Sequence, residues 1–389
     1  MSLKLFSFAQ EWKELSRFES LDISERSVVF YAETKTSMSH FKLLIQELTE
    51  KMNLQICYVT SVKDDPIFET KNENIKPFYI GKGTVRTKFF LTLKAKILIM
   101  DMPDLNTFHI KRSKVYDVHY IYIFHSMVST HMIYRKNAFD HFDTVFCVGK
   151  HHIDEIRKHE QVNGLIPKNL LEFGYGKLDI LLDEHEKKLL SSNLKKEKTI
   201  LIAPSWGEHG LIELYGQVII KTLLETGYNV ILRPHPRTFK KSKKIINDIQ
   251  RNFENNPNFL LELHIRDSTS FYNSDCMISD WSGVSLEYAF VLEKPVLFVD
   301  VLKKINNHDY TELGITPLEE KIRTEIGSII QPTQLSDIAL HVENLWKKHD
   351  ELNQNIKLIK SKTVFNIGSS KKIGSKYIMD LLTKNMIAD

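Results

Sequence analysis

Short apolar runs alternate with amphipathic stretches along most of the chain. Residues 27–32, SVVFYA, are apolar or β-branched, and residues 39–52, SHFKLLIQELTEKM, carry apolar side chains at helical spacing. Apolar runs of about four to eight residues favour strands, whereas apolar residues three and four apart favour helices. Further strands are predicted at residues 54–60, 96–100, 118–124 and 144–149, and a strand end with a turn is predicted at residues 170–179. Strands that alternate with helices build parallel sheets, so the first half is predicted to be an α/β unit.

A charged segment at residues 184–198, EHEKKLLSSNLKKEK, interrupts this alternation. It is rich in lysine and lacks strong periodicity, so we expect a surface helix followed by a linker. Beyond it the pattern restarts, with predicted strands at 199–205, 228–232, 258–263, 276–280 and 295–301 and predicted helices at 212–227, 240–253, 283–293 and from about 333 onward. The chain therefore predicts two α/β domains, residues 1–185 and 195–389, with terminal helices available to pack back on the first.

Composition narrows the class of protein. The 389 residues are 42% hydrophobic and 26% charged, with a formal net charge of only +4, which does not indicate a nucleic-acid partner. Cys57, Cys147 and Cys276 are far apart and odd in number, as expected for a reduced cytoplasmic protein. The first residues lack a secretory h-region, and no run approaches the roughly 18 to 20 apolar residues that span a bilayer.

Residues 231–239, ILRPHPRTF, are unusual for the end of a buried strand. Arg233 and His235 are each followed by a proline, which holds the backbone extended and prevents a helix from starting at the histidine. In open parallel sheets, ligands bind beyond the carboxyl ends of the strands. A fixed guanidinium and a fixed imidazole at such an end favour an anionic ligand.

A second strand end lies at residues 278–285, ISDWSGVS. Ser279 and Asp280 end the predicted strand, and Ser282 and Gly283 open a helix. The first N–H groups of a helix have no partner within it, so such a start can bind a phosphate. The alternative is an ordinary helix cap, a role that serine fills in many proteins.

The predicted strand in residues 118–124 is followed by His125 and Ser126. A lone histidine at a strand end is usually structural. Here, however, it occupies the position in the first half that His235 occupies in the second. If the two halves face each other, both imidazoles approach one cleft. His131 is a weaker candidate, on the helix expected to follow.

The strand end at residues 202–210, IAPSWGEHG, brings Ser205, Trp206 and His209 to the same kind of position. The indole of Trp206 could stack on a nucleotide base. Packing in the core is the more common role for a lone tryptophan.

Other segments carry weaker signals. Residues 78–90, FYIGKGTVRTKFF, have two glycines but no Gly-Lys-Ser/Thr ending, so a phosphate loop is not indicated. Asp101, Asp104 and His109 lack metal-ligand spacing, and no metal is predicted. The lysines of 240–244 are typical of a solvated helix face, with contact to anionic lipid headgroups as the alternative.

Together these motifs resemble those of the CDP-glycerol glycerophosphotransferase family, which builds teichoic acids and capsules. The second half carries APSW, RPHP, SDWSGVSLEYA and KPVLF in the family's order, and the first half carries YIFHSM and EFGYGKLD more loosely. The resemblance covers about residues 115–305 and leaves residues 1–110 without a counterpart in the family.

The resemblance implies a GT-B architecture, in which two Rossmann-like domains face each other across a cleft. It also implies transfer of glycerol or ribitol phosphate from a CDP-activated donor to a hydroxyl of a saccharide or lipid-linked acceptor, with neither a metal nor another cofactor. Such an enzyme would be cytoplasmic, with peripheral contact to the inner face of the plasma membrane as a further expectation.

Site residues follow from the matching motifs. His125 is the expected general base, and His235 is expected to act on the donor diphosphate. The expected donor-binding residues are Ser205, Trp206, Arg233, Ser279, Asp280, Ser282, Gly283 and Glu287, and the expected acceptor-binding residues are Ser126 and His209.

The chain also departs from the family's pattern. Ser126-Met127 replaces a common glycine and proline, Gly283 replaces a common second serine, and Glu287 replaces a frequent aspartate. These differences leave the donor open. A GT-B glycosyltransferase that uses a Kdo-like CMP-sugar or a UDP-sugar is one alternative, and a non-catalytic nucleotide- or glycan-binding module is another.

Overall fold

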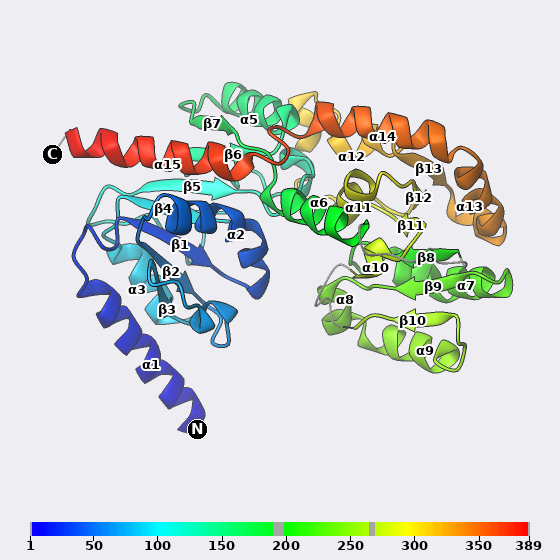
Figure 1. The fold of residues 1–389 in the computed structure, drawn as a ribbon, viewed down its shortest axis with the longest axis horizontal. Coiled ribbons are helices and arrows are strands. Elements are labelled where there is room, and N and C mark those ends of the chain that lie inside the picture. Colours follow the sequence, from blue (N-terminus) through cyan, green and yellow to red (C-terminus); the bar gives the residue numbers. More distant parts are fainter. Residues whose placement is uncertain (1, 190–197, 264–268, 388–389) are drawn as a thin grey trace.

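The computed structural model describes residues 2–189, 198–263 and 269–387, which contain two sheets (Figure 1). The strand orders are β3-β2-β1-β4-β5-β6-β7 and β10-β9-β8-β11-β12-β13, and every neighbouring pair is parallel. In both sheets the order reverses beside the first strand, which is the Rossmann pattern. The predicted pair of Rossmann-like domains is therefore confirmed.

The first sheet is covered by helices on both faces. Its strands are β1 (Val28–Ala32), β2 (Ile56–Thr60), β3 (Ile75–Tyr79), β4 (Ile97–Met100), β5 (His119–Ile123), β6 (Thr144–Cys147) and β7 (Asn169–Glu172). The helices of this part are α1 (Ser2–Glu19), α2 (Met38–Gln46), α3 (Thr84–Thr92), α4 (Thr130–Ile133), α5 (Lys150–Asn163) and α6 (Gly176–Leu189), with short helical turns η1 (Lys35–Ser37), η2 (Glu47–Lys51) and η3 (Pro66–Glu69).

The second sheet repeats the arrangement. Its strands are β8 (Thr199–Ile202), β9 (Asn229–Leu232), β10 (Phe259–Leu261), β11 (Cys276–Ser279), β12 (Val296–Val299) and β13 (Gly327–Ile330). The remaining elements are α7 (Leu211–Glu225), α8 (Pro236–Lys241), α9 (Lys243–Phe253), α10 (Thr269–Tyr272), α11 (Val284–Leu292), η4 (Tyr310–Leu313), α12 (Leu318–Ile322), η5 (Pro332–Asp337), α13 (Ile338–Lys347), α14 (His349–Thr363) and α15 (Ser370–Ile387).

Burial explains why these runs form strands. Every residue of the central strands β1, β2, β4, β8, β11 and β12 is buried, because helices cover both faces of a parallel sheet. The edge strands β7 and β10 are partly exposed. The cores are therefore aliphatic and aromatic, and polar side chains gather beyond the strand ends.

Two strands were not predicted from the sequence, and one predicted helix is divided. Strand β3 contains Pro77, which a sheet tolerates at its edge, and β3 is the edge strand. Strand β13 is the opposite edge of the second sheet. The helix expected at 240–253 breaks at Ser242 into α8 and α9, where the Ser242 hydroxyl donates to Glu213 at 2.8 Å.

The C-terminal helix α15 returns to the first domain (Figure 1). Asp179 of α6 accepts a hydrogen bond from the Ser370 amide at 3.3 Å, and the Tyr377 hydroxyl lies 2.8 Å from that of Thr144 in β6. A side chain on Gly374 would contact Phe173 and Phe146. Of residues 184–198, predicted as a surface helix followed by a linker, residues 184–189 belong to α6 and residues 190–197 lie outside the described residues.

The helices and the cysteines were each the subject of an expectation from the sequence. Within residues 2–189, 198–263 and 269–387, each helix is too short or too polar to cross a bilayer. The thiols of Cys57, Cys147 and Cys276 are buried and unpaired.

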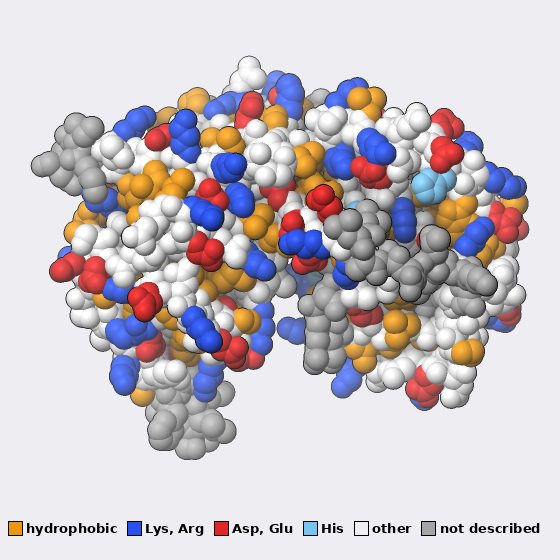
Figure 2. Space-filling model, in the orientation of Figure 1, with side chains coloured by type: hydrophobic (Ala, Val, Ile, Leu, Met, Phe, Trp, Pro, Cys, Tyr) orange, Lys and Arg blue, Asp and Glu red, His pale blue; other side chains and the backbone are white. Residues whose placement is uncertain are grey.

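Figure 2 shows a notch between the two domains, with Lys and Arg side chains at its margins.

Candidate functional site

The tautomer of His125 is fixed by a backbone carbonyl. Its Nδ1 lies 3.1 Å from the carbonyl oxygen of Asp101, at the end of β4, and 3.3 Å from the Tyr122 hydroxyl. A carbonyl oxygen only accepts hydrogen bonds, so Nδ1 of the neutral ring carries the proton. The second nitrogen, Nε2, is therefore left with a free lone pair. His125 thus has the tautomer that a general base requires.

The surroundings of His125 keep it neutral. Its side chain is exposed to solvent, yet enough protein surrounds the ring that desolvation lowers its pKa below the ordinary value. The bond to Asp101 opposes this shift, and the positive charges of Lys177 and Arg237 add to it. Arg237 belongs to the second domain, so the electrostatic effect places it near the histidine of the first.

Helix α11 of the second domain packs directly against the segment that follows His125. A Cβ on Gly283 would lie 2.5 Å from Ser126 Oγ. One turn later, Glu287 accepts hydrogen bonds from Lys177 Nζ at 2.7 Å and from the Tyr175 hydroxyl at 3.0 Å. The same Tyr175 hydroxyl lies 3.0 Å from the His125 carbonyl oxygen. The start of α11 is thus held beside His125.

The predicted phosphate cradle divides into two parts. Ser282 and Gly283 are half-buried at the start of α11, where a ligand could reach them. Ser279 is fully buried and donates to the Ala203 carbonyl at 2.9 Å. Asp280 is buried as well and accepts from the amide and hydroxyl of Ser205 at 2.7 and 2.9 Å. The Asp280 carboxylate and the Ser205 hydroxyl therefore hold the β8 and β11 ends together.

Cationic side chains surround Trp206 in the second domain. Lys304 Nζ lies 4.1 Å from the centre of the indole ring, the Arg237 guanidinium 4.6 Å and Lys241 Nζ 4.9 Å. Within the described residues, none of these cations has a carboxylate within 4.0 Å. Burial lowers the pKa of Lys304 to about 8, with help from Arg237 and against the pull of Asp280. Such a group of unpaired cations attracts an anion.

His235 lies beside this cluster, its ring centre 6.2 Å from that of Trp206. Its Nδ1 accepts a hydrogen bond from the Arg237 amide at 3.1 Å, which caps helix α8. Burial lowers the pKa of His235 to about 4, with Lys304 and Arg237 adding to the effect. The ring is therefore neutral at pH 7, and its remaining nitrogen, Nε2, carries a proton. His235 thus presents a hydrogen-bond donor, whereas His125 presents an acceptor.

The described contacts of Arg233 and His209 do not join them to this arrangement. The Arg233 guanidinium donates to Ser270 Oγ at 2.7 Å and lies 3.8 Å from Glu262. Its side chain is buried, so these contacts hold it within its own domain. His209 is exposed on the loop before α7, and no contact with another predicted site residue is found for it in the described parts of the chain.

Sequence reasoning missed four residues that complete the site: Tyr175, Lys177, Arg237 and Lys304. Arg237 directly follows the RPHP motif, and that adjacency was the available signal. Lys304 reaches Trp206 from the loop after β12, where the Asn306 amide is bonded to the Met132 carbonyl at 3.0 Å. No sequence pattern predicts a contact of that kind.

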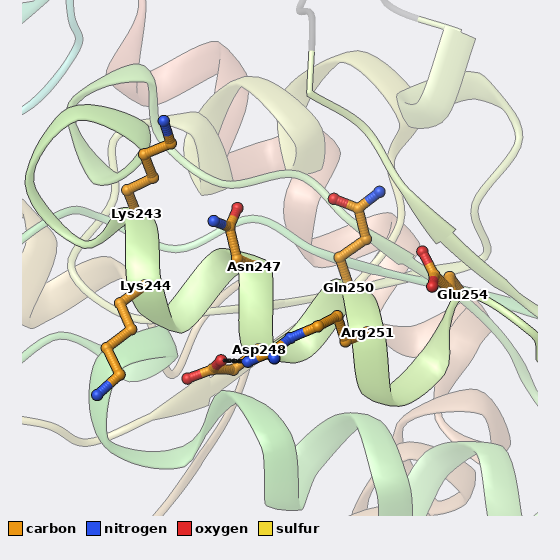
Figure 3. Close-up of a pocket in the computed structure, with 7 residues that line it drawn as sticks. All are labelled: Lys243, Lys244, Asn247, Asp248, Gln250, Arg251 and Glu254. Atoms are coloured by element: carbon orange, nitrogen blue, oxygen red, sulfur yellow. Dashed lines mark hydrogen bonds and ion pairs between the residues drawn. The ribbon is translucent and has the colours of Figure 1, made fainter.

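The lysine-rich face of α9 is separate from the site. Figure 3 shows Lys243, Lys244, Asn247, Gln250 and their neighbours along the outer side of this helix, with an ion pair between Asp248 and Arg251. The opposite face carries the buried Ile246 and Ile249. The hollow on this surface is shallow and shares no residue with the strand-end site. Metal-binding clusters of His, Cys, Asp and Glu are not found in the described residues.

Comparisons with known proteins give a family and a fold. A family model described as CDP-Glycerol:Poly(glycerophosphate) glycerophosphotransferase matches residues 15–303. The expected span of 115–305 was therefore too short, because the family pattern extends through the first Rossmann strands. A search of curated protein sequences found no match.

Solved structures share the two-domain architecture. A variant of the wall teichoic acid polymerase TagF aligns with a TM-score of 0.61 and 18% identity, over 99% of this chain and 96% of that one. UDP-GlcNAc 2-epimerase from Neisseria meningitidis bound to UDP-GlcNAc aligns with a TM-score of 0.59 and 14% identity, over 91% of this chain and 99% of that one. Likeness at such identities shows the fold, and the predicted GT-B architecture is confirmed.

Proposed function

Because the chain belongs to the CDP-glycerol:poly(glycerophosphate) glycerophosphotransferase family, we propose that its strand-end site transfers glycerol phosphate from CDP-glycerol to an acceptor hydroxyl. The family makes the protein a transferase of the CDP-glycerol type. The proposal adds which residues carry the reaction and that the acceptor is a saccharide or a lipid-linked polymer end. It is supported by a solved TagF structure soaked with CDPG, which shares the fold.

The first domain is proposed to activate the acceptor. As the acceptor oxygen attacks the phosphorus nearer the glycerol, His125 Nε2 accepts the hydroxyl proton. A new P–O bond forms to the acceptor, and the P–O bond to CMP breaks. The carbonyl of Asp101 holds the ring in orientation throughout, because Nδ1 donates to it at 3.1 Å. A neutral base with a lowered pKa is ready for this step at pH 7.

The second domain is proposed to bind the donor and to stabilise the leaving group. The Nε2–H of His235 would donate to a phosphate oxygen, while Arg237 and Lys304 would offset the negative charge that grows on CMP. The amides at the start of α11 would bind the second phosphate. Positioning and electrostatic stabilisation are the main contributions of proteins to phosphoryl transfer. Trp206 would then stack on the nucleotide or shield the phosphates from water.

One observation carries the proposal. The two strand-end histidines are held in opposite tautomers, one by a carbonyl acceptor and the other by an amide donor. One ring can therefore take a proton from the nucleophile while the other donates a hydrogen bond to the leaving group. A module that only binds nucleotides has no need of a base with a free lone pair.

The test is release of nucleotide from a panel of donors. CDP-glycerol, CDP-ribitol, a CMP-sugar and a UDP-sugar would each be incubated with the protein and a lipid-linked saccharide acceptor. We expect CMP release from CDP-glycerol above all others. Turnover of only the CMP-sugar or the UDP-sugar would refute the proposal in favour of a glycosyltransferase. Tight CDP binding without any turnover would identify a binding module.

We further propose that the protein acts in the cytoplasm and meets its acceptor at the membrane surface. The lysine-bearing face of α8 and α9 would contact the anionic leaflet. Sedimentation with vesicles of phosphatidylglycerol should retain the protein, and vesicles of phosphatidylcholine should not. The first domain would bind the acceptor and the second the donor.

A further inference from the structure

The contact between Ser126 and Gly283 crosses the domain boundary at the centre of the site. The three atoms nearest to a Cβ built on Gly283 all belong to the first domain: Ser126 Oγ at 2.5 Å, Val128 Cγ1 at 3.1 Å and Ser126 Cβ at 3.8 Å. Real Cβ atoms do not approach other atoms as closely as 2.5 Å. Glycine is therefore the only residue type that fits at position 283 without displacing the Ser126 hydroxyl. Its φ of −61° is open to any residue, so the backbone does not require glycine.

Hydrogen bonds hold the chain on both sides of Ser126. Before it, the His125 carbonyl accepts from the Tyr175 hydroxyl at 3.0 Å, and after it, His151 Nε2 lies 2.9 Å from the Met127 carbonyl. The Ser126 hydroxyl has no protein partner among the described residues. Because the residue is half-buried, the hydroxyl is accessible to a ligand.

The hydroxyl lies at the start of α11, where the second domain has its own free donors. The first amides of a helix have no acceptor within it. Ser126 therefore adds a donor from the first domain to the group that Ser282 and the α11 amides form in the second. The pairing of Glu287 with Tyr175 and Lys177, one turn along α11, holds the two parts together.

We infer that Ser126, which the resemblance assigned to the acceptor, is instead a positioning residue of the donor-phosphate site. Its hydroxyl takes the space that a side chain at position 283 would fill, and it completes the phosphate cradle from across the domain boundary. Ser126 directly follows His125, so the same contact fixes the base relative to the phosphorus. The inference rests on the proposed function for its substrate, but the shape of the contact does not depend on it.

Five variants separate the hydroxyl from the packing. Ser126→Gly removes the hydroxyl, and Gly283→Ala adds the clash. The double variant Ser126→Gly/Gly283→Ala removes the hydroxyl and its 2.5 Å clash, and it leaves the 3.1 Å contact with Val128 that the exchange variant also has. The exchange Ser126→Gly/Gly283→Ser moves the hydroxyl to the helix. Gly83→Ala is the matched control, because Gly83 also precedes a helix but a Cβ there meets nothing within 4 Å.

Kinetics of CMP release from CDP-glycerol and calorimetric affinity for CDP are the two measurements. A hydrogen bond to a charged phosphate suggests that Ser126→Gly weakens CDP binding and raises the donor KM by about tenfold or more. We expect the exchange variant to recover both to within about threefold of wild type. The Ser126→Gly/Gly283→Ala variant should stay as impaired as Ser126→Gly, and Gly83→Ala should match wild type.

The outcomes are decisive in both directions. Wild-type behaviour of Ser126→Gly, or equal recovery by the exchange and by Ser126→Gly/Gly283→Ala, would overturn the role of the hydroxyl. Failure of the wild-type protein to turn over CDP-glycerol would instead contradict the proposed function. In that case the CDP affinities of the same variants would still test the inference.

Discussion

Replacement of His125 by alanine is the sharpest test of the site. The change removes Nε2, the atom proposed to take the acceptor proton, and leaves the cations around Trp206 and the start of α11 in place. Because those groups belong to the other domain, donor affinity should change little. Turnover should fall, since the variant lacks the nitrogen that is proposed to take the acceptor proton.

The size of the loss follows from the role of the residue. General-base assistance contributes about 10²–10⁴-fold to a rate. At about 1.4 kcal/mol for each factor of ten, the variant should lose about 3 to 5 kcal/mol of transition-state stabilisation. The Kd for CDP should remain within about threefold of wild type, because a residue that acts only in the transition state affects kcat and leaves binding unchanged.

The pH profile adds a second signature. The pKa of His125 lies below its ordinary 6.5, so more than half of the catalytic base is still unprotonated at pH 6.5. Wild-type kcat should therefore fall to half of its plateau only in buffer more acidic than pH 6.5. In the alanine variant this acidic decline should be absent, because the titrating group is gone.

The rate of CMP release at saturating donor gives kcat, and its measurement between pH 5 and 8 gives the pH profile. Calorimetry gives the Kd for CDP. His141→Ala is the matched control, because His141 is exposed on the same domain and its side chain has no role in the site. Turnover of the His125→Ala variant within about threefold of wild type would refute the assignment of the base. An acidic decline in kcat that is the same in the variant as in the wild type would refute it as well.

Three other predictions follow from contacts already described. Replacement of His235 by alanine should lower kcat and weaken CDP binding, each by about tenfold or more, and calorimetry showing unchanged affinity would contradict its role as a donor to phosphate. Lys177→Met should leave the buried Glu287 carboxylate without its cation. The free energy of unfolding in urea titrations should fall by about 2 to 4 kcal/mol. An unchanged midpoint of unfolding would show that the ion pair does not stabilise the fold. His235 has a pKa of about 4 in the folded protein against an ordinary 6.5, so between these pH values the unfolded chain binds one more proton than the folded one. The free energy of unfolding, measured by urea titration, should therefore fall as the pH drops from 6.5 towards 4. This fall should be smaller in the His235→Gln variant, and an identical pH dependence would contradict the buried, neutral state of His235.

Much of the fold could be predicted from the sequence, because buried parallel strands read as continuous apolar runs. The central strands show this, and the Rossmann order follows from their alternation with helices. The edge strands β3 and β13 were missed, since an edge tolerates Pro77 and polar residues. The family's extent was also underestimated, because the first 110 residues share its fold pattern without its strand-end motifs.

The site was predictable only in part. His125 and His235 follow strands, so their positions could be read from the sequence. Their tautomers could not, because these depend on the Asp101 carbonyl and the Arg237 amide in the folded chain. The approach of Lys304 to Trp206 likewise depends on a loop fixed from the other domain. Whether Arg233 contacts the donor remains a prediction, since the described contacts join it to Ser270 and Glu262.

The return of α15 to the first domain has a mechanical consequence. The polypeptide passes between the lobes twice, and the second passage is clamped where the Phe365 amide bonds the Val148 carbonyl at 2.8 Å. Two crossings leave the domains less free to move relative to each other than one crossing would. A chain cut before Ser370 would therefore lose more than its last helix. It would uncover Phe146 and Phe173, and the second crossing would no longer be anchored on the first domain by α15.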